Sequence, residues 1–187
     1  MQVNEYRFQG NEGEIVPTSV VNLIVNPGVQ VLPYDFCKGY AWLRKVSLPK
    51  GLIEIDHWAF CRCKSLLEIK ISSTVESIGY RSFKDCVLLA KVEFEESSSL
   101  SHQLKTIDEE AFWGCESLER IEFPSSVNMI GQYAFAGSCS ALVEAMLSTR
   151  SITEIPHSLF WGCDSLQTVS LPNSLERIGD EAFFECD

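Results

Sequence analysis

A repeat of 23 residues constrains the fold of this chain more than any other feature of its sequence. Three stretches have this length: Leu52–Thr74, Leu104–Ser126 and Ile152–Ser174. Val75–Gln103 is the same unit with a six-residue insertion, and Val127–Ser151 is the unit with two extra residues. Self-similarity at a period of about 20 to 50 residues is typical of proteins built from stacked structural repeats.

Two columns of the repeat do not vary. The fourth position is always isoleucine and the ninth is always phenylalanine, also in a truncated last copy, Leu175–Asp187. These core candidates are Ile55, Phe60, Ile78, Phe83, Ile107, Phe112, Ile130, Phe135, Ile155, Phe160, Ile178 and Phe183. One copy is too short to bury such side chains alone, so we expect successive copies to stack and share one core.

The spacing within each copy predicts one short strand and one return segment. In Leu118–Pro124, strict alternation places Ile121 and Phe123 on the same side of a strand. Proline ends the strand because it lacks a backbone donor, as at Pro49, Pro124 and Pro172. Strands of successive copies should pair in parallel, and the brief A-F-x-G-C segment predicts a single helical or 3₁₀ turn on the opposite side.

A single domain over residues 1–187 is expected. Its parts are a lead-in with a capping strand (1–28), a degenerate repeat (29–51), full repeats (52–174) and a truncated repeat without a C-terminal cap (175–187). Val20–Val25 is the capping strand, and Phe36 comes one residue early, so the turn before it should differ. An uncapped coil exposes a strand edge, which makes end-to-end self-association a candidate interaction.

Composition narrows the classes of partner. The net charge of −11 argues against nucleic acid bound through a basic surface and against docking on anionic lipid. No stretch approaches the roughly 18 apolar residues of a membrane span. The N-terminal MQVNEYRFQG lacks the apolar region of a secretory signal, which predicts a cytoplasmic protein.

The eight cysteines do not indicate a disulfide framework, a metal centre or a catalytic site. Six of them occupy one repeat column: Cys63, Cys86, Cys115, Cys139, Cys163 and Cys186. We expect reduced thiols that pack as small buried groups. Zinc is the alternative at Cys61 and Cys63, but the chain offers no second close pair and no histidine motif. No catalytic or phosphate-binding motif is present, so neither enzymatic activity nor a cofactor is predicted.

Outward-facing strand positions are the candidate protein-binding residues. One column holds Lys45, Glu68, Lys91, Arg120, Glu144 and Thr168, the next holds Lys70, Glu93 and Glu122, and Glu119 lies beside them. Alternating charges on neighbouring strands stabilise each other by about 0.2–1 kcal/mol per pair, so the first interpretation is a self-satisfied charge ladder. The second is a polar recognition surface, with a basic partner docking around Glu93, Glu119 and Glu122.

Two further features allow both a structural and a functional interpretation. Trp113 and Trp161 share a repeat position two coils apart; they either fill crevices between coils or act as interface hot spots, where Trp is common. The insertion within Glu95–Gln103 is either a tolerated surface loop or part of a binding face. Ser97–Ser99 within it are candidate phosphorylation sites.

The full pattern, A-F-x-x-C-x-x-L-x-x-[IV]-x-[LIF]-P-x-[SG]-[VL]-x-x-I-G, resembles the BspA-type leucine-rich repeat, the type 5 class, over Val29–Asp187. The resemblance implies an α/β leucine-rich-repeat solenoid, a horseshoe of mostly strand and loop, with its parallel sheet on the concave face and short turns on the convex face. It also implies recognition of another protein without catalytic residues. Some bacterial members adhere to host proteins, so a surface adhesin or cell-recognition fragment is one alternative, although the missing signal departs from those members. A structural repeat fragment without independent function is the other.

Overall fold

The computed structural model describes residues 2–95, 102–137, 139–147, 149 and 151–186, and within them the chain forms strands and turns but no helix. The strands are β1 Val3–Phe8, β2 Val20–Val25, β3 Val31–Leu32, β4 Lys45–Ser47, β5 Glu54–Ile55, β6 Glu68–Ile71, β7 Ser77–Ile78, β8 Lys91–Phe94, β9 Thr106–Ile107, β10 Arg120–Glu122, β11 Met129–Ile130, β12 Glu144–Met146, β13 Glu154–Ile155, β14 Thr168–Ser170 and β15 Arg177–Ile178.

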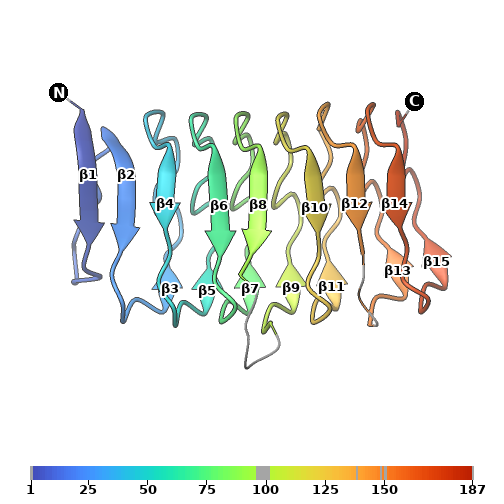
Figure 1. Ribbon diagram of the computed structural model, residues 1–187, viewed down its shortest axis with the longest axis horizontal. Helices are drawn as coiled ribbons and strands as arrows, with labels where there is room; N and C mark the ends of the chain where they lie inside the picture. Colours follow the sequence, from blue (N-terminus) through green and yellow to red (C-terminus); the bar gives the residue numbers. More distant parts are fainter. Residues whose placement is uncertain (1, 96–101, 138, 148, 150, 187) are drawn as a thin grey trace.

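The strands form two parallel layers along one axis (Figure 1). We call β1, β2, β4, β6, β8, β10, β12 and β14 the front sheet. It corresponds to the parallel sheet that was predicted for the concave face. The shorter strands β3, β5, β7, β9, β11, β13 and β15 form the back sheet. Each coil between residues 29 and 174 contributes one back strand and then one front strand, so the predicted parallel solenoid is confirmed.

The N-terminal lead-in contains more structure than its polar sequence indicated. β2 has the predicted bounds, and β1 pairs with it in parallel, with Tyr6 opposite Leu23 and Phe8 opposite Val25. Phe8 is buried while most of β1 is exposed or half-buried. A strand that packs through only one face lacks a long apolar run, so the sequence pattern did not reveal it.

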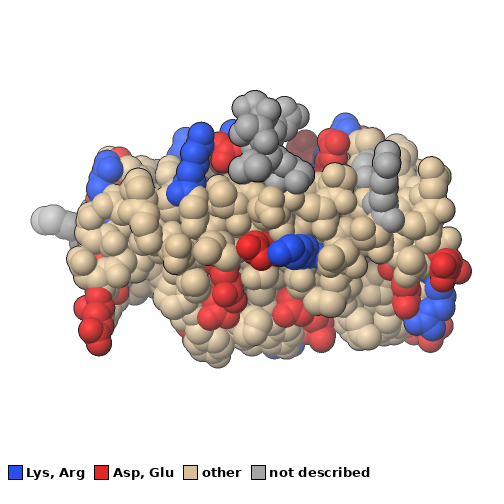
Figure 2. All heavy atoms as spheres, turned by 90° about the horizontal axis from the view of Figure 1, so that it is seen from below, with Lys and Arg blue, Asp and Glu red and all other residues tan. Residues whose placement is uncertain are grey.

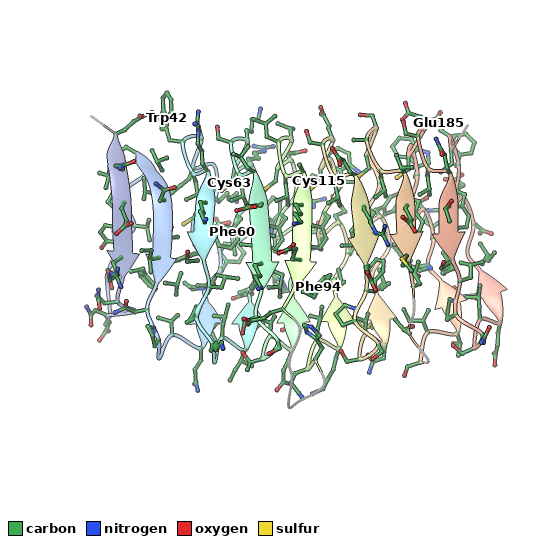
Figure 3. The ribbon with its side chains drawn as sticks, in the orientation of Figure 1. Trp42, Phe60, Cys63, Phe94, Cys115 and Glu185 are labelled. Atoms are coloured by element: carbon green, nitrogen blue, oxygen red, sulfur yellow. The ribbon has the colours of Figure 1, made fainter. Side chains whose placement is uncertain are left out.

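A stack of phenylalanine rings runs from coil to coil through the hydrophobic core. Phe83 and Phe112 lie with ring centroids 5.1 Å apart and planes 1° apart, and Phe112 and Phe135 are 5.2 Å apart at 11°. Phe60, labelled in Figure 3, begins the stack. Ile178 departs from the expected burial: it is 50% exposed because only one neighbouring coil covers it in the described residues.

The return segments consist of successive turns, not the expected 3₁₀ or helical turn. The seventh repeat position has positive φ in every coil: Asp35, Trp58, Arg81, Glu110, Tyr133, Ser158 and Glu181. A left-handed residue cannot continue a right-handed helix. Instead the backbone bonds to the next coil, as in Glu110 N to Gln132 O at 3.0 Å and Phe112 N to Ala134 O at 2.8 Å. These bonds form a ladder across what we call the convex side.

The degenerate repeat 29–51 uses the same turn as the others, contrary to the expectation from Phe36. Asp35 has φ 58°, like its equivalents in later coils. Cys37 N bonds to Ala59 O, which is the bond that phenylalanine makes elsewhere, and Cys37 is fully buried. A cysteine therefore replaces phenylalanine in the core column, while Phe36 packs edge-on against Phe60.

The cysteine column satisfies backbone carbonyls between coils. Cys86 Sγ lies 3.2 Å from Phe60 O, and Cys115 Sγ lies 3.4 Å from Phe83 O. Burial raises the pKa of both thiols well above the ordinary value and raises the pKa of Cys63 to about 12. Protonated thiols that donate to carbonyls fit the structural role, and the described cysteines are free of disulfides.

Each of the two copies with extra residues lies beside a break in one of the two sheets. The front sheet divides into β1-β2-β4-β6-β8 and β10-β12-β14, next to the insertion, whose residues 96–101, including Ser97–Ser99, lie outside the described residues. The back sheet divides between β11 and β13, within and after the copy with two extra residues. The front strands keep their order, but pairing lapses between β8 and β10.

Candidate functional site

The front sheet places the candidate charged residues in the two predicted columns. Lys45 pairs in register with Glu68, Glu68 with Lys91, and Arg120 with Glu144. Lys70 lies opposite Glu93 in the second column. Because neighbouring residues of a strand point to opposite faces, these side chains are exposed or half-buried while Val46, Ile69 and their equivalents face the core.

The charge ladder is satisfied only in separate pairs. Lys45 lies 3.8 Å from Glu68, and Arg120 lies 2.8 Å from Glu144. Lys91 turns away from Glu68 and lies 2.5 Å from Glu93 on its own strand. That hydrogen bond raises the pKa of Lys91 and lowers the pKa of Glu93.

A cleft lies where the front sheet is interrupted. It has a volume of about 780 Å³, and its charged lining residues are Lys70, Lys91, Glu93, Glu95, Arg120 and Glu122. Half-buried Phe94 and buried Phe123 supply apolar surface. A smaller hollow of about 290 Å³ lies over β4, β6 and β8 and shares Lys70, Lys91 and Glu93 with it.

The acidic candidates divide between the cleft and its surroundings. Glu95 and Glu122 line the cleft, and neither forms an ion pair within the described residues. Glu119 lies outside the cleft lining, one residue before β10, and is exposed. The structure therefore brings Glu93, Glu95 and Glu122 together, and leaves Glu119 beside them.

The two tryptophans lie on the convex side, away from the front face. Trp113 is half-buried; Lys84 Nζ lies 3.9 Å from its ring centroid, and a Cβ at Gly137 would overlap its ring. Trp113 thus fills the contact between two coils. Trp161 is half-buried at the equivalent position. The structure does not bring either residue to the charged columns.

Sequence reasoning missed an ion network on the convex side. Glu110 accepts two hydrogen bonds from Arg81, at 2.9 and 2.6 Å, and lies 2.5 Å from Lys84 Nζ. Burial disfavours the charged form of Glu110, but the hydrogen bonds from Arg81 and Lys84 outweigh it and lower the pKa of this carboxyl. Arg81 also lies over the rings of Trp58 and Tyr80. Arg81 and Glu110 share the seventh position of adjacent copies, which is the signal that could have found them.

Charge is distributed unevenly along the solenoid axis. Residues 1–91 contain 11 Lys and Arg against 9 Asp and Glu, whereas residues 92–187 contain 4 against 17. The front face follows this trend, because cations prevail on β4, β6 and the start of β8 and acids prevail around β10. Most of the underside is uncharged, and its acidic and basic groups are scattered (Figure 2). The sequence count alone could have revealed this polarity.

Neither a metal-holding cluster nor a membrane-spanning helix is found among the described residues. They contain no group of three or more His, Cys, Asp or Glu side chains arranged to hold a metal ion. They also contain no helix with the length and apolar character needed to cross a membrane.

The parallel sheets of short strands and their shared core define a leucine-rich-repeat protein. The model of the BspA-type leucine-rich repeat region, which comprises six copies, matches residues 30–101 and 96–187. The chain therefore belongs to the BspA-type leucine-rich-repeat family.

Two solved structures share this fold, and a third has a lower similarity. The leucine-rich repeat protein TpLRR of T. pallidum is 25% identical with a TM-score of 0.61, over 98% of this chain and 70% of that chain. The pneumococcal vaccine antigen PcpA is 19% identical with a TM-score of 0.54, over 95% and 64%. A leucine-rich cell surface protein of Faecalibacterium prausnitzii is 25% identical with a TM-score of 0.48, over 90% and 52%. The chain thus spans about half to 70% of these chains, and no curated protein matches it in sequence.

Proposed function

We propose that the protein is a non-enzymatic recognition module that binds a basic segment of another protein on the front face. The carrying observation is the cleft between β8 and β10, in which Glu93, Glu95 and Glu122 lie among Lys70, Lys91 and Arg120. Two of these carboxylates have no ion-pair partner within the described residues, so a cation of the partner need not displace an existing salt bridge.

The other charged residues of the front face also support binding of a partner at this cleft. Lys45 and Glu68 on one side, and Glu144 on the other, flank the cleft, and Lys70, Lys91 and Arg120 line it together with the carboxylates. Exposed ion pairs contribute little to stability, about 0–1 kcal/mol, so they can exchange partners at low cost. Complementary charge mainly gives specificity and a fast association rate. An extended basic segment across β8 and β10 fits this arrangement.

Binding of a labelled lysine-rich synthetic peptide tests the proposal by fluorescence anisotropy. Reversing both Glu95→Lys and Glu122→Lys should weaken binding by about tenfold or more, which corresponds to about 1.4 kcal/mol, and the loss should shrink at high salt. Glu176→Lys with Glu181→Lys is the matched control, because these exposed glutamates lie in the last coil. Equal losses in both double variants would show nonspecific attraction and defeat the proposal.

A further inference from the structure

The positions that lead into β4, β6 and β8 form a second unusual surface, which we call the upper edge. It consists of Trp42, Arg44, Lys64, Leu67 and Leu88. Trp42 is 55% exposed, and Leu67 and Leu88 are each 48% exposed. Figure 3 shows Trp42 projecting from the top of the molecule, away from the front sheet.

These residues lie on adjacent coils and form one patch. Leu67 N bonds to Arg44 O at 3.2 Å, and Ala90 N bonds to Leu67 O at 2.9 Å. Trp42 and Leu88 share a repeat position two coils apart, which separates their backbones by roughly 10 Å. Single exposed apolar residues are common on protein surfaces, whereas a contiguous apolar patch indicates a binding surface.

The charges beside the patch indicate what covers it. Arg44 and Lys64 are exposed and form no ion pair within the described residues. Arg62 makes only a loose contact with Asp85, at 3.5 Å. The next coil carries Glu116 and Glu119, which bound the cationic region on its C-terminal side. A partner with acidic groups around apolar side chains is complementary to this edge.

We propose that the upper edge docks an acidic amphipathic segment of a partner protein. Its apolar side chains pack on Trp42, Leu67 and Leu88, and its carboxylates reach Arg44 and Lys64. Tryptophan and arginine are the residue types that most often dominate interface energies. This surface shares no lining residue with the cleft between β8 and β10, so the two proposals can be tested separately.

Two short synthetic peptides with the same apolar residues test the docking by titration calorimetry on the full chain. One peptide carries glutamate at its polar positions and the other carries lysine. With the carboxylates of the cleft neutralised by Glu95→Gln and Glu122→Gln, the glutamate peptide should bind at least about tenfold more tightly than the lysine peptide. The double variants Trp42→Ala with Leu67→Ala, and Arg44→Glu with Lys64→Glu, should each weaken it by about tenfold or more.

Matched control variants distinguish binding at the upper edge from nonspecific binding. Val143→Ala removes an exposed apolar side chain from the same column three coils beyond Leu67, and Lys50→Glu reverses an exposed cation elsewhere. Both should leave the affinity unchanged, and circular dichroism of every variant should match that of the unmodified chain. Equal affinity for the two peptides, or equal losses in the controls, would overturn the proposal. So would binding of phosphatidylserine vesicles through Trp42 in place of the glutamate peptide, which would assign the edge to a membrane surface.

Discussion

The junction between the coils 75–103 and 104–126 is tight on the convex side and open on the front side. On the convex side, Phe83 N bonds to Ala111 O at 2.8 Å and Asp85 N to Trp113 O at 2.8 Å, and Arg81 and Lys84 converge on Glu110. On the front side, the sheet ladder lapses between β8 and β10, and the backbone bond that leads into β10, from Glu119 N to Ala90 O, is 3.5 Å long.

The junction between these two coils is thus stabilised on its convex side and open on its front side. Stability of a stacked repeat depends on each interface between neighbours, and the convex ladder and phenylalanine stack maintain it. The inserted residues fall in the connection from the front strand to the next back strand, so they disturb the front sheet and leave β7 paired with β9. The open side carries Glu95 and Glu122, which form no ion pair within the described residues.

The largest expected effect is in the core between these coils. Phe112→Ala should lower the free energy of unfolding by about 3–5 kcal/mol, because it leaves a cavity in the ring stack. Phe94→Ala on the open side is the matched control and should cost less, since Phe94 is only half-buried. Chemical denaturation of both variants measures the difference, and similar losses would contradict the contrast between the two sides.

A smaller loss is expected from the convex ion network. Glu110→Gln removes the charge that faces Arg81 and Lys84, whose side chains are 27% and 16% exposed. We expect a loss of roughly 2–3 kcal/mol, between the values for exposed and for buried pairs. Glu122→Gln on the front side should change the free energy of unfolding by less than about 0.5 kcal/mol. Comparable effects of the two substitutions would show that the network is only a surface feature.

The same network predicts a dependence of stability on pH. The pKa of Glu110 is lower in the folded chain than its usual 4.5, so the unfolded chain binds more protons when it is acidified. The contribution of Glu110 is fully present above about pH 4.5 and is lost as the pH falls through the folded-state pKa. The stability gap between the unmodified chain and Glu110→Gln should therefore narrow below that pH in denaturation curves. A constant gap down to acid unfolding would exclude this assignment.

The smallest effect is expected for an ion pair of the front face. Arg120→Ala should cost less than about 1 kcal/mol, because Arg120 and Glu144 have side chains that are 55% and 31% exposed. A double-mutant cycle with Glu144→Ala measures the coupling between the two residues. A coupling well above that value would mean that the front ladder stabilises the fold as much as the convex network does.

Much of the architecture could be predicted from the periodicity of the sequence. The invariant phenylalanines indicated one shared core, and the prolines marked where strands stop: β10 ends at Glu122, two residues before Pro124. The turn type was missed because six different residue types occupy the left-handed seventh position across the seven coils, so no glycine marked it. The register of Cys37 was missed because a neighbouring phenylalanine appeared to be the better match.

The repeat by itself determined the parallel solenoid, the phenylalanine stack and the outward charge columns, because period and alternation fix which side chains face the core. Only the tertiary structure decided which charges meet. Lys91 turns to Glu93 instead of Glu68, Arg81 reaches Glu110 across the convex side, and the front sheet opens beside the insertion. Long charged side chains have several partners within reach, and the packing of neighbouring coils selects among them.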